Sequence, residues 1–334
     1  MPLRVGVLGP VYADSLEDNV LRSVARLGHE GVKAGSLGGG QTSKWGSRAS
    51  SAGLKIPQVA ARMQQRLVDH LPQDLDLLIV TTSTATQLFP WVVAELKRRV
   101  RRVVVWYVDA VSNLGPARFL DSPYDAVFLT DRMLVRQVRD GLRLPVHLLP
   151  EGHDPRQHRP VGIAGEQRTI VVVGNYRAER IALLRQLHRD GIPLTLYGRA
   201  LPEWARSPEL ERLHTGKWVT GLDKSRVFHE SAAVLNTLHP AVLDAVNCRV
   251  FEAAAAGAVV VAEWRPLLDE LFANGSEVLA YRTYEELLIL LRRCLDSPED
   301  MNAIRLAVAA RAARDHTLDQ RVAQMIEMAG LAAG

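Results

Sequence analysis

Cysteine is nearly absent from this chain of 334 residues, because Cys248 and Cys294 are its only two. Two cysteines exclude a disulfide framework and a zinc site built from several thiolates, so we interpret both as packing residues. The histidines are scattered without the spacing of a metal site. The sequence therefore predicts neither a disulfide-stabilised scaffold nor a metal centre.

Long hydrophobic runs are also missing. The longest apolar run, residues 253–262, has ten residues, well below the roughly 20 that a membrane-spanning helix needs. The first ten residues enter an expected strand directly and lack the layout of a secretory signal. We therefore expect a cytoplasmic protein.

Positive charge is in small excess, and the formal net charge is +4. This charge fits an anionic small molecule or an anionic surface but is too weak to indicate a nucleic-acid partner. The densest basic run, residues 97–102, closes an expected helix, where cations complement the helix dipole. Our default interpretation is a solvated helix end. The alternative is a weak peripheral membrane contact with anionic lipid, relevant if the acceptor is a lipid.

The first half of the chain alternates β-branched runs with helical stretches, which predicts βαβ units and a parallel, doubly wound sheet. The expected strands are residues 3–8, 75–81, 103–108 and 126–130, and the expected helices are 16–27 and 90–102. Gly9, Thr82 and Asp109 follow three of these strands, so we expect them at one ligand-binding crevice. A Gly/Ser-rich segment, residues 35–53, is interpreted as a loop at the rim of this site or as an insertion.

A proline-rich segment at residues 148–160 marks the expected domain junction, after which the β/α alternation resumes. The chain length also favours two domains of roughly 150 residues. The second half predicts strands at 169–173, 194–197, 233–236 and 258–263, and helices at 178–190, 225–231, 247–256, 267–273, 284–296 and 301–313. We therefore expect an α/β protein with Rossmann-like domains over residues 1–155 and 156–313, and a C-terminal helix within 314–334 that packs back on the first domain.

Residues 244–262 (DAVNCRVFEAAAAGAVVVA) form the most informative stretch. Asn247 is a candidate N-cap of a short Ala-rich helix, and Gly257 suits its C-terminal turn. Unpaired N–H groups at such a helix N-terminus favour a phosphate. Arg249 and Glu252 add a cation and an anion, which a nucleotide sugar needs for its diphosphate and its ribose hydroxyls. The alternative is a surface ion pair between these two residues on a helix that packs by its alanines.

The order of motifs in the second half resembles a known family. RVFEAAAAG at residues 249–257 is followed by LLDELFANGSEV at 267–278, YEEL at 284–287 and DHTLDQR at 315–321. Over residues 168–325 this order resembles the spore-maturation-protein-like glycosyltransferases, relatives of the large retaining GT-B group. Residues 149–155 and 173–180 also look like family segments, whereas residues 1–140 match only as a generic acceptor domain. The resemblance implies two Rossmann-like domains facing a cleft, with the acceptor on the N-terminal side.

The implied reaction moves a sugar from a nucleoside-diphosphate sugar, with uridine or guanosine as base, to a hydroxyl of an unidentified small-molecule, glycan or lipid acceptor. By resemblance, Glu252 would accept hydrogen bonds from the ribose, and Arg180 and Arg249 would neutralise the diphosphate. The whole implied donor-binding set is Gly174, Asn175, Tyr176, Arg180, Lys217, Asp244, Asn247, Arg249 and Glu252.

Three members of this set carry an alternative or depart from the pattern. Arg180 is either a diphosphate cation or a solvated residue near the start of its helix. Asp244 stands where the retaining group usually has a glutamate that binds the donor sugar, so its sugar contact departs from the pattern. Lys217 is either a second phosphate cation or an exposed turn lysine.

Catalysis in this interpretation is electrostatic stabilisation of the leaving diphosphate by Arg180 and Arg249, without a metal or other cofactor. The D-x-D sequence at residues 74–76 is interpreted as the polar start of a buried strand. Asp109 is the candidate base for the acceptor hydroxyl, or a residue that orients it, and His153 joins Gly9, Thr82 and Asp109 as a cleft residue. The family relationship favours retention. The alternatives are a sugar-nucleotide epimerase of the same fold and a non-catalytic nucleotide-sugar-binding protein.

Overall fold

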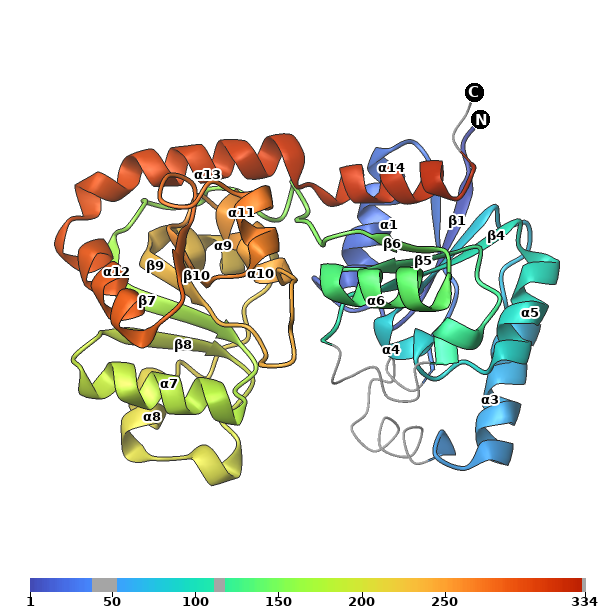
Figure 1. The fold of residues 1–334 in the computed structure, drawn as a ribbon, viewed down its shortest axis with the longest axis horizontal. Helices are drawn as coiled ribbons and strands as arrows, with labels where there is room; N and C mark the ends of the chain where they lie inside the picture. The colour runs from blue at the N-terminus through green and yellow to red at the C-terminus, as the bar shows by residue number, and fades with distance from the viewer. Residues whose placement is uncertain (38–52, 111–117, 332–334) are drawn as a thin grey trace. The chain divides into compact units, whose positions relative to one another are not determined.

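The computed structural model describes residues 1–37, 53–110 and 118–331 of the chain. It forms two compact units (Figure 1). Unit 1 comprises Met1–Glu151 and Leu318–Gly334, and unit 2 comprises Gly152–Thr317. Most of the Gly/Ser-rich segment that we interpreted as a rim loop or an insertion, residues 38–52, lies outside the described residues.

Unit 1 is built on a six-stranded parallel sheet with the strand order β2-β1-β3-β4-β5-β6. The strands are β1 (Arg4–Leu8), β2 (Glu30–Lys33), β3 (Leu77–Thr81), β4 (Arg102–Tyr107), β5 (Ala126–Leu129) and β6 (Val146–Leu148). The order reverses at β1, so the carboxyl ends of β1 and β3 flank the crevice where sheets of this type bind ligands. The doubly wound parallel sheet expected for the first half is confirmed.

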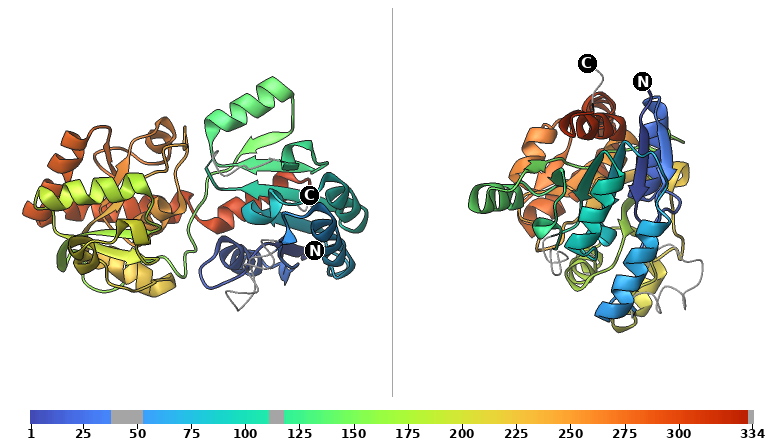
Figure 2. Two further views of the ribbon diagram at one scale, coloured as in Figure 1. Left: turned by 90° about the horizontal axis from the view of Figure 1, so that it is seen from below. Right: turned by 90° about the vertical axis from the view of Figure 1, so that its right-hand side faces the viewer.

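Helices cover both faces of this sheet (Figure 2). The helices are α1 (Leu16–Arg26), α3 (Pro57–Asp69), α4 (Thr82–Ala85), α5 (Pro90–Arg99), α6 (Arg132–Leu142) and α14 (Leu318–Met328), with a short 3-10 turn at Arg118–Asp121. One face packs against α3, α4, α5 and α6, and the other packs against α1 and α14.

The last helix, α14, lies alongside α1 (Figures 1 and 2). Arg26 Nη2 of α1 lies 2.7 Å from Asp319 Oδ1 of α14. Val322 and Met325 of α14 are fully buried in the same apolar cluster as Trp106 of β4. The C-terminal helix therefore completes one face of the unit 1 core, although some 170 residues of unit 2 precede it.

The basic run at the end of α5 is largely paired within unit 1. Lys97 Nζ lies 3.0 Å from Asp125 Oδ1. Glu95 pairs with Arg98 at 2.7 Å and with Arg99 at 3.2 Å. This pairing agrees with a solvated helix end. None of the helices in the described ranges has the length and apolar character needed to cross a membrane.

Unit 2 is built on a five-stranded parallel sheet with the strand order β11-β10-β9-β7-β8. The strands are β7 (Gln167–Gly174), β8 (Leu194–Gly198), β9 (Ser231–Asn236), β10 (Val260–Glu263) and β11 (Leu279–Tyr281). The four strands expected here are confirmed. The three-residue β11 was not predicted, because so short a run carries no clear periodicity.

One face of the unit 2 sheet packs against α7 (Ala178–Arg189), α8 (Pro208–Leu213) and α12 (Tyr284–Asp296). The other packs against α9 (Gly221–Glu230), α10 (Cys248–Ala255) and α11 (Pro266–Leu271), and α13 (Met301–Asp315) contributes to both. Short 3-10 turns lie at Glu203–Ala205 and Pro298–Asp300. Helix α9 begins at Gly221, four residues before the expected start at Ser225. The prediction missed this first turn because glycine is a poor helix former.

We expect Met325→Ala to lower the free energy of unfolding of unit 1 by about 2–5 kcal/mol, the usual range for truncating a buried methionine. Hydrogen exchange of the β1, β3 and β4 amides in urea would measure this, since a chain of two units need not unfold in one step. The control is Met328→Ala on the same helix, because Met328 is 44% exposed whereas Met325 is 0% exposed. Equal effects of the two changes would contradict the packing role of α14.

Candidate functional site: the carboxyl edge of the unit 2 sheet

Helix α10 begins where the sequence predicts. Asn247 is its N-cap, and the side-chain oxygen Oδ1 accepts a hydrogen bond from the backbone N–H of Arg249 at 3.2 Å. Gly257 follows the helix with φ of +68°, the left-handed conformation that ends helices. Because α10 connects the parallel neighbours β9 and β10, its N-terminus lies at the carboxyl ends of these strands. The helix therefore directs unpaired N–H groups to this edge of the sheet.

Arg249 extends from the first turn of α10 to the end of β7. Gly174 is the last residue of β7 and has φ of +135°. A Cβ atom on Gly174 would lie 2.7 Å from Nη2 of Arg249, so only glycine leaves room for this guanidinium group. The Arg249 side chain is half-buried, and within the described ranges no group forms a hydrogen bond or ion pair with its guanidinium.

Arg180, on α7, is held beside it by backbone and hydroxyl oxygens. Its Nε donates to Thr237 Oγ1 at 2.7 Å, and its Nη2 donates to the Thr237 carbonyl at 3.0 Å. Its Nη1 donates to the Asn175 carbonyl at 2.7 Å. Burial, and secondarily the charge of Arg249, lower the pKa of Arg180 to about 10. The two arginines are therefore close together, and Arg180 remains protonated at neutral pH because a pKa of about 10 lies well above 7.

The other expected residues of this edge surround the arginine pair. Asn175 is exposed directly after β7. Tyr176 is buried and donates its hydroxyl to the Tyr197 carbonyl at 2.8 Å, and burial raises its pKa. Lys217 is exposed, and its carbonyl accepts from the N–H of Gly198 at the end of β8 at 2.9 Å. The edge therefore carries two arginines and a lysine.

Glu252 is buried, and its cation is Lys224 of α9 rather than Arg249. The Lys224 Nζ lies 2.9 Å from Oε1 of Glu252, and the His158 Nε2 lies 3.9 Å from the same oxygen. The alternative of a surface ion pair between Arg249 and Glu252 is therefore wrong. Lys224 was not predicted because it lies just before the helix that we expected from residue 225.

Asp244 is buried at the start of the loop that leads to α10. Its Oδ1 accepts a hydrogen bond from the backbone N–H of Leu267 at 2.7 Å. Leu267 lies in the first turn of α11, where backbone N–H groups lack partners within the helix. Asp244 therefore stabilises the start of α11, and this contact connects two segments of unit 2.

Comparison with known proteins gives a family match for part of the chain and similar solved structures for nearly all of it. The model of the glycosyl transferase-like family matches residues 177–327. Sucrose-phosphate synthase from Thermosynechococcus elongatus has a similar structure, with 12% identity, a TM-score of 0.66 and 98% of each chain covered. Anabaena HepE, solved with UDP and glucose, is 15% identical, with a TM-score of 0.66 over 98% of this chain and 99% of that one. Among curated proteins, none matches the sequence.

Residues 177–327 are similar to the glycosyl transferase-like family, and the similar solved structures show that the chain has the GT-B fold. The two parallel sheets with helices on both faces are those expected of this fold. The similar structures cover nearly the whole chain, although the family model matches only the C-terminal part.

In unit 1, Gly9, Thr82 and Asp109 lie at the carboxyl edge of neighbouring strands, as expected. The backbone N–H of Val108, after β4, donates to Thr82 Oγ1 at 2.9 Å. Asp109 is exposed, and its Oδ1 accepts from the N–H of Ala110 at 2.8 Å. Asp109 therefore presents a solvated carboxylate at this edge.

A second carboxyl group of the unit 1 edge was not predicted. Glu17, in the first turn of α1, is buried and accepts a hydrogen bond from the hydroxyl of Thr81, the last residue of β3. Burial raises the pKa of Glu17. A Cβ atom on Gly9 would lie 2.6 Å from Oε1 of Glu17, so this contact requires glycine after β1. Acidic residues are common in the first turn of a helix, so Glu17 was not distinguishable from an ordinary helix-start residue.

His153 is buried in unit 2, where it joins the segment after Gly152 to the end of α13. Its backbone N–H donates to the His316 carbonyl at 3.0 Å, and its Nε2 lies 3.2 Å from the Ala312 carbonyl. Burial, with a smaller contribution from the nearby His158, lowers the pKa of His153 to about 4. The ring is therefore neutral at physiological pH and supports the packing of unit 2.

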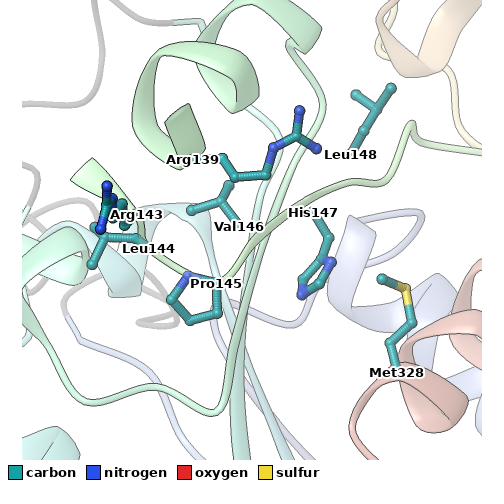
Figure 3. A pocket seen from close by; sticks show the side chains of 8 residues that line it. All are labelled: Arg139, Arg143, Leu144, Pro145, Val146, His147, Leu148 and Met328. Atoms are coloured by element: carbon teal, nitrogen blue, oxygen red, sulfur yellow. The ribbon is translucent and has the colours of Figure 1, made fainter. Parts of the chain in front are cut away.

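Unit 1 also has a pocket of about 540 Å³ (Figure 3). It lies beside the edge strand β6, and its lining residues are Arg139, Arg143, Leu144, Pro145, Val146, His147, Leu148 and Met328. Burial, and then the charge of Arg139, lower the pKa of His147. None of the expected site residues lines this pocket.

We expect Gly174→Ala to destabilise unit 2 more than Gly191→Ala does. Both glycines have positive φ, which costs a non-glycine residue roughly 1–2 kcal/mol. A Cβ atom at Gly191 meets no atom within 4 Å, whereas one at Gly174 meets the Arg249 guanidinium. Thermal unfolding of the two variants measures the difference. Equal melting temperatures would contradict the close approach of Arg249 to Gly174.

We expect acid to destabilise unit 2 between pH 6.5 and 4 through His153. The unfolded chain takes up a proton as the pH falls below the ordinary histidine pKa of 6.5, whereas folded His153 does so only near pH 4. Above pH 6.5 protonation of His153 does not change the free energy of unfolding. Below pH 4 it lowers the free energy of unfolding by about 3 kcal/mol. The pH dependence of unfolding should therefore be shallower in His153→Gln. The half-exposed His188 supplies the control variant His188→Gln, and an equal flattening there would contradict this role of His153.

Proposed function

We propose that the protein is a glycosyltransferase that takes its sugar from a nucleoside-diphosphate sugar bound at the carboxyl edge of the unit 2 sheet. The observation that carries this proposal is the pair of arginines at the N-terminus of α10. Arg249 has no protein partner in the described ranges, and no carboxylate contacts Arg180. Two neighbouring, partly desolvated cations without a counterion favour a ligand of two or more negative charges. A diphosphate at a helix N-terminus meets this requirement.

Arg180 and Arg249 then have different roles in the proposed reaction. Arg180 is oriented by three hydrogen bonds to protein oxygens, so it supplies charge from a fixed position. Arg249 has its hydrogen-bond donors available for the leaving diphosphate. Charge develops on that diphosphate as the sugar departs, so prearranged cations lower the barrier without a metal ion. Lys217 and the N–H groups at Gly174, Asn175 and Asn247 complete the proposed phosphate site.

Glu252 is proposed to accept hydrogen bonds from the ribose of the donor. Its buried carboxyl group pairs with Lys224 Nζ at 2.9 Å, which holds the side chain in place. The donor base is proposed to be uridine, because HepE is a similar structure solved with UDP and glucose. Guanosine is the alternative base.

The acceptor is proposed to bind through its hydroxyl at the carboxyl edge of the unit 1 sheet, beside Gly9, Thr82 and Asp109. Asp109 either accepts the hydroxyl proton or orients the hydroxyl while the leaving phosphate accepts it. We propose that transfer proceeds with retention. A similar structure, that of trehalose-6-phosphate synthase, comes from work on transfer with retention, which supports this choice.

Incubation with nucleotide sugars and candidate acceptors tests the activity directly. Free nucleoside diphosphate together with a glycosylated acceptor supports a transferase. An altered sugar that remains on its nucleotide indicates an epimerase, and an unchanged ligand indicates a binding protein. A thermal-shift screen of uridine, guanosine, thymidine and adenosine diphosphates identifies the base first, because a ligand that binds only the folded state raises the melting temperature.

We expect Arg249→Gln to weaken binding of nucleoside diphosphate roughly 10- to 100-fold, since hydrogen bonds to charged groups contribute about 1.5–3 kcal/mol each. Isothermal titration with the diphosphate measures the loss. Arg168→Gln is the control, because Arg168 is exposed near the opposite, amino end of β7. A diphosphate affinity unchanged in Arg249→Gln would contradict the proposed site.

A further inference from the structure

Asn236, the last residue of β9, is buried without any partner for its side chain. It is 2% exposed. Neither Oδ1 nor Nδ2 has a hydrogen-bond partner. Within the part of the chain that the structure describes, it is the one buried side chain with two such unpartnered polar atoms. An unpaired buried polar group costs about 1–3 kcal/mol, so this arrangement needs a compensating role.

Asn236 lies at the carboxyl edge of the unit 2 sheet, the edge that carries Arg180 and Arg249. Side chains alternate between the two faces of a strand, and Val234 of β9 packs in the core beneath α10. Asn236 therefore lies on the same face, at the carboxyl end of the strand, where α10 begins. The next residue, Thr237, supplies both oxygens that hold Nε and Nη2 of Arg180. The amide thus lies beside the proposed diphosphate site.

The hydrogen-bonding chemistry of the Asn236 amide distinguishes a phosphate ligand from a hydroxyl ligand. A carboxamide has a donor end and an acceptor end, and both are unpartnered here. A fully ionised phosphate only accepts hydrogen bonds, so it would satisfy Nδ2 and leave Oδ1 facing negative oxygens. A hydroxyl group both donates and accepts, so hydroxyls can satisfy both ends. The amide therefore fits a sugar better than it fits a phosphate.

We propose that Asn236 binds a hydroxyl group of the sugar being transferred and is a specificity-determining residue of the donor site. This inference rests on the proposed function, because it requires a nucleotide sugar at the carboxyl edge of unit 2. Glu252 is already assigned to the ribose, so the hydroxyl that Asn236 binds belongs to the sugar beyond the diphosphate. The two unpartnered atoms lower the stability of the free protein and are satisfied when the sugar binds.

The test compares Asn236→Leu with wild type for two ligands, UDP and UDP-glucose, by isothermal titration. Leucine has the same branching at Cγ as asparagine but is larger and forms no hydrogen bond. We expect about tenfold or greater weakening of UDP-glucose binding and less than about twofold change for UDP. Retained UDP binding also shows that the variant is folded at this edge of the sheet.

Thr169→Val is the matched control. Thr169 lies near the amino end of β7 in the same sheet, and its Oγ1 also lacks a partner. This change should leave both affinities unaltered. Equal loss of UDP and UDP-glucose binding in Asn236→Leu would overturn the proposal, since the contact would then be to the nucleotide. Unchanged affinities would overturn it as well. If the wild-type protein binds neither ligand, the proposal of a uridine-linked donor fails.

Discussion

The structure of the proposed donor site depends on the approach of one arginine to one glycine. Arg249 fits against Gly174 because that residue has no Cβ atom, and Arg180 is fixed beside it by oxygens of Asn175 and Thr237. Helix α10 makes this possible because its small alanines pack closely on the sheet and bring its N-terminus to the carboxyl edge. The strands and helices of unit 2 therefore support a small cationic site.

The acidic groups of unit 2 explain why this site keeps its positive charge. Glu252 pairs with Lys224, and Glu263 at the end of β10 pairs with Arg265 at 2.8 Å. Asp244 accepts a backbone hydrogen bond at the start of α11. These contacts occupy the carboxylates with protein partners, whereas Arg249 has none in the described ranges. The free charge that results is available to an anionic ligand.

Most strands were predictable because buried parallel strands are nearly continuous hydrophobic runs. Residues 77–81 and 231–236 are examples, since every residue of β3 and β9 is buried. The short edge strands β2 and β6 were missed, because β2 reads EGVK and β6 has only three residues. Helices α3 and α6 were also missed. Only pairing with a neighbouring strand or packing against the sheet distinguishes such segments from loops.

The sequence alone determined most strands and helices and the Asn247 cap of α10, because these depend on neighbours within a few residues. The tertiary structure alone decided that Lys224 pairs with Glu252, that Glu17 meets Thr81 and that Asn236 has no partner. Each of these outcomes depends on segments distant in the chain that folding brings together. Local propensity carries no information on such encounters, so the environment of a buried polar side chain is a property of the fold.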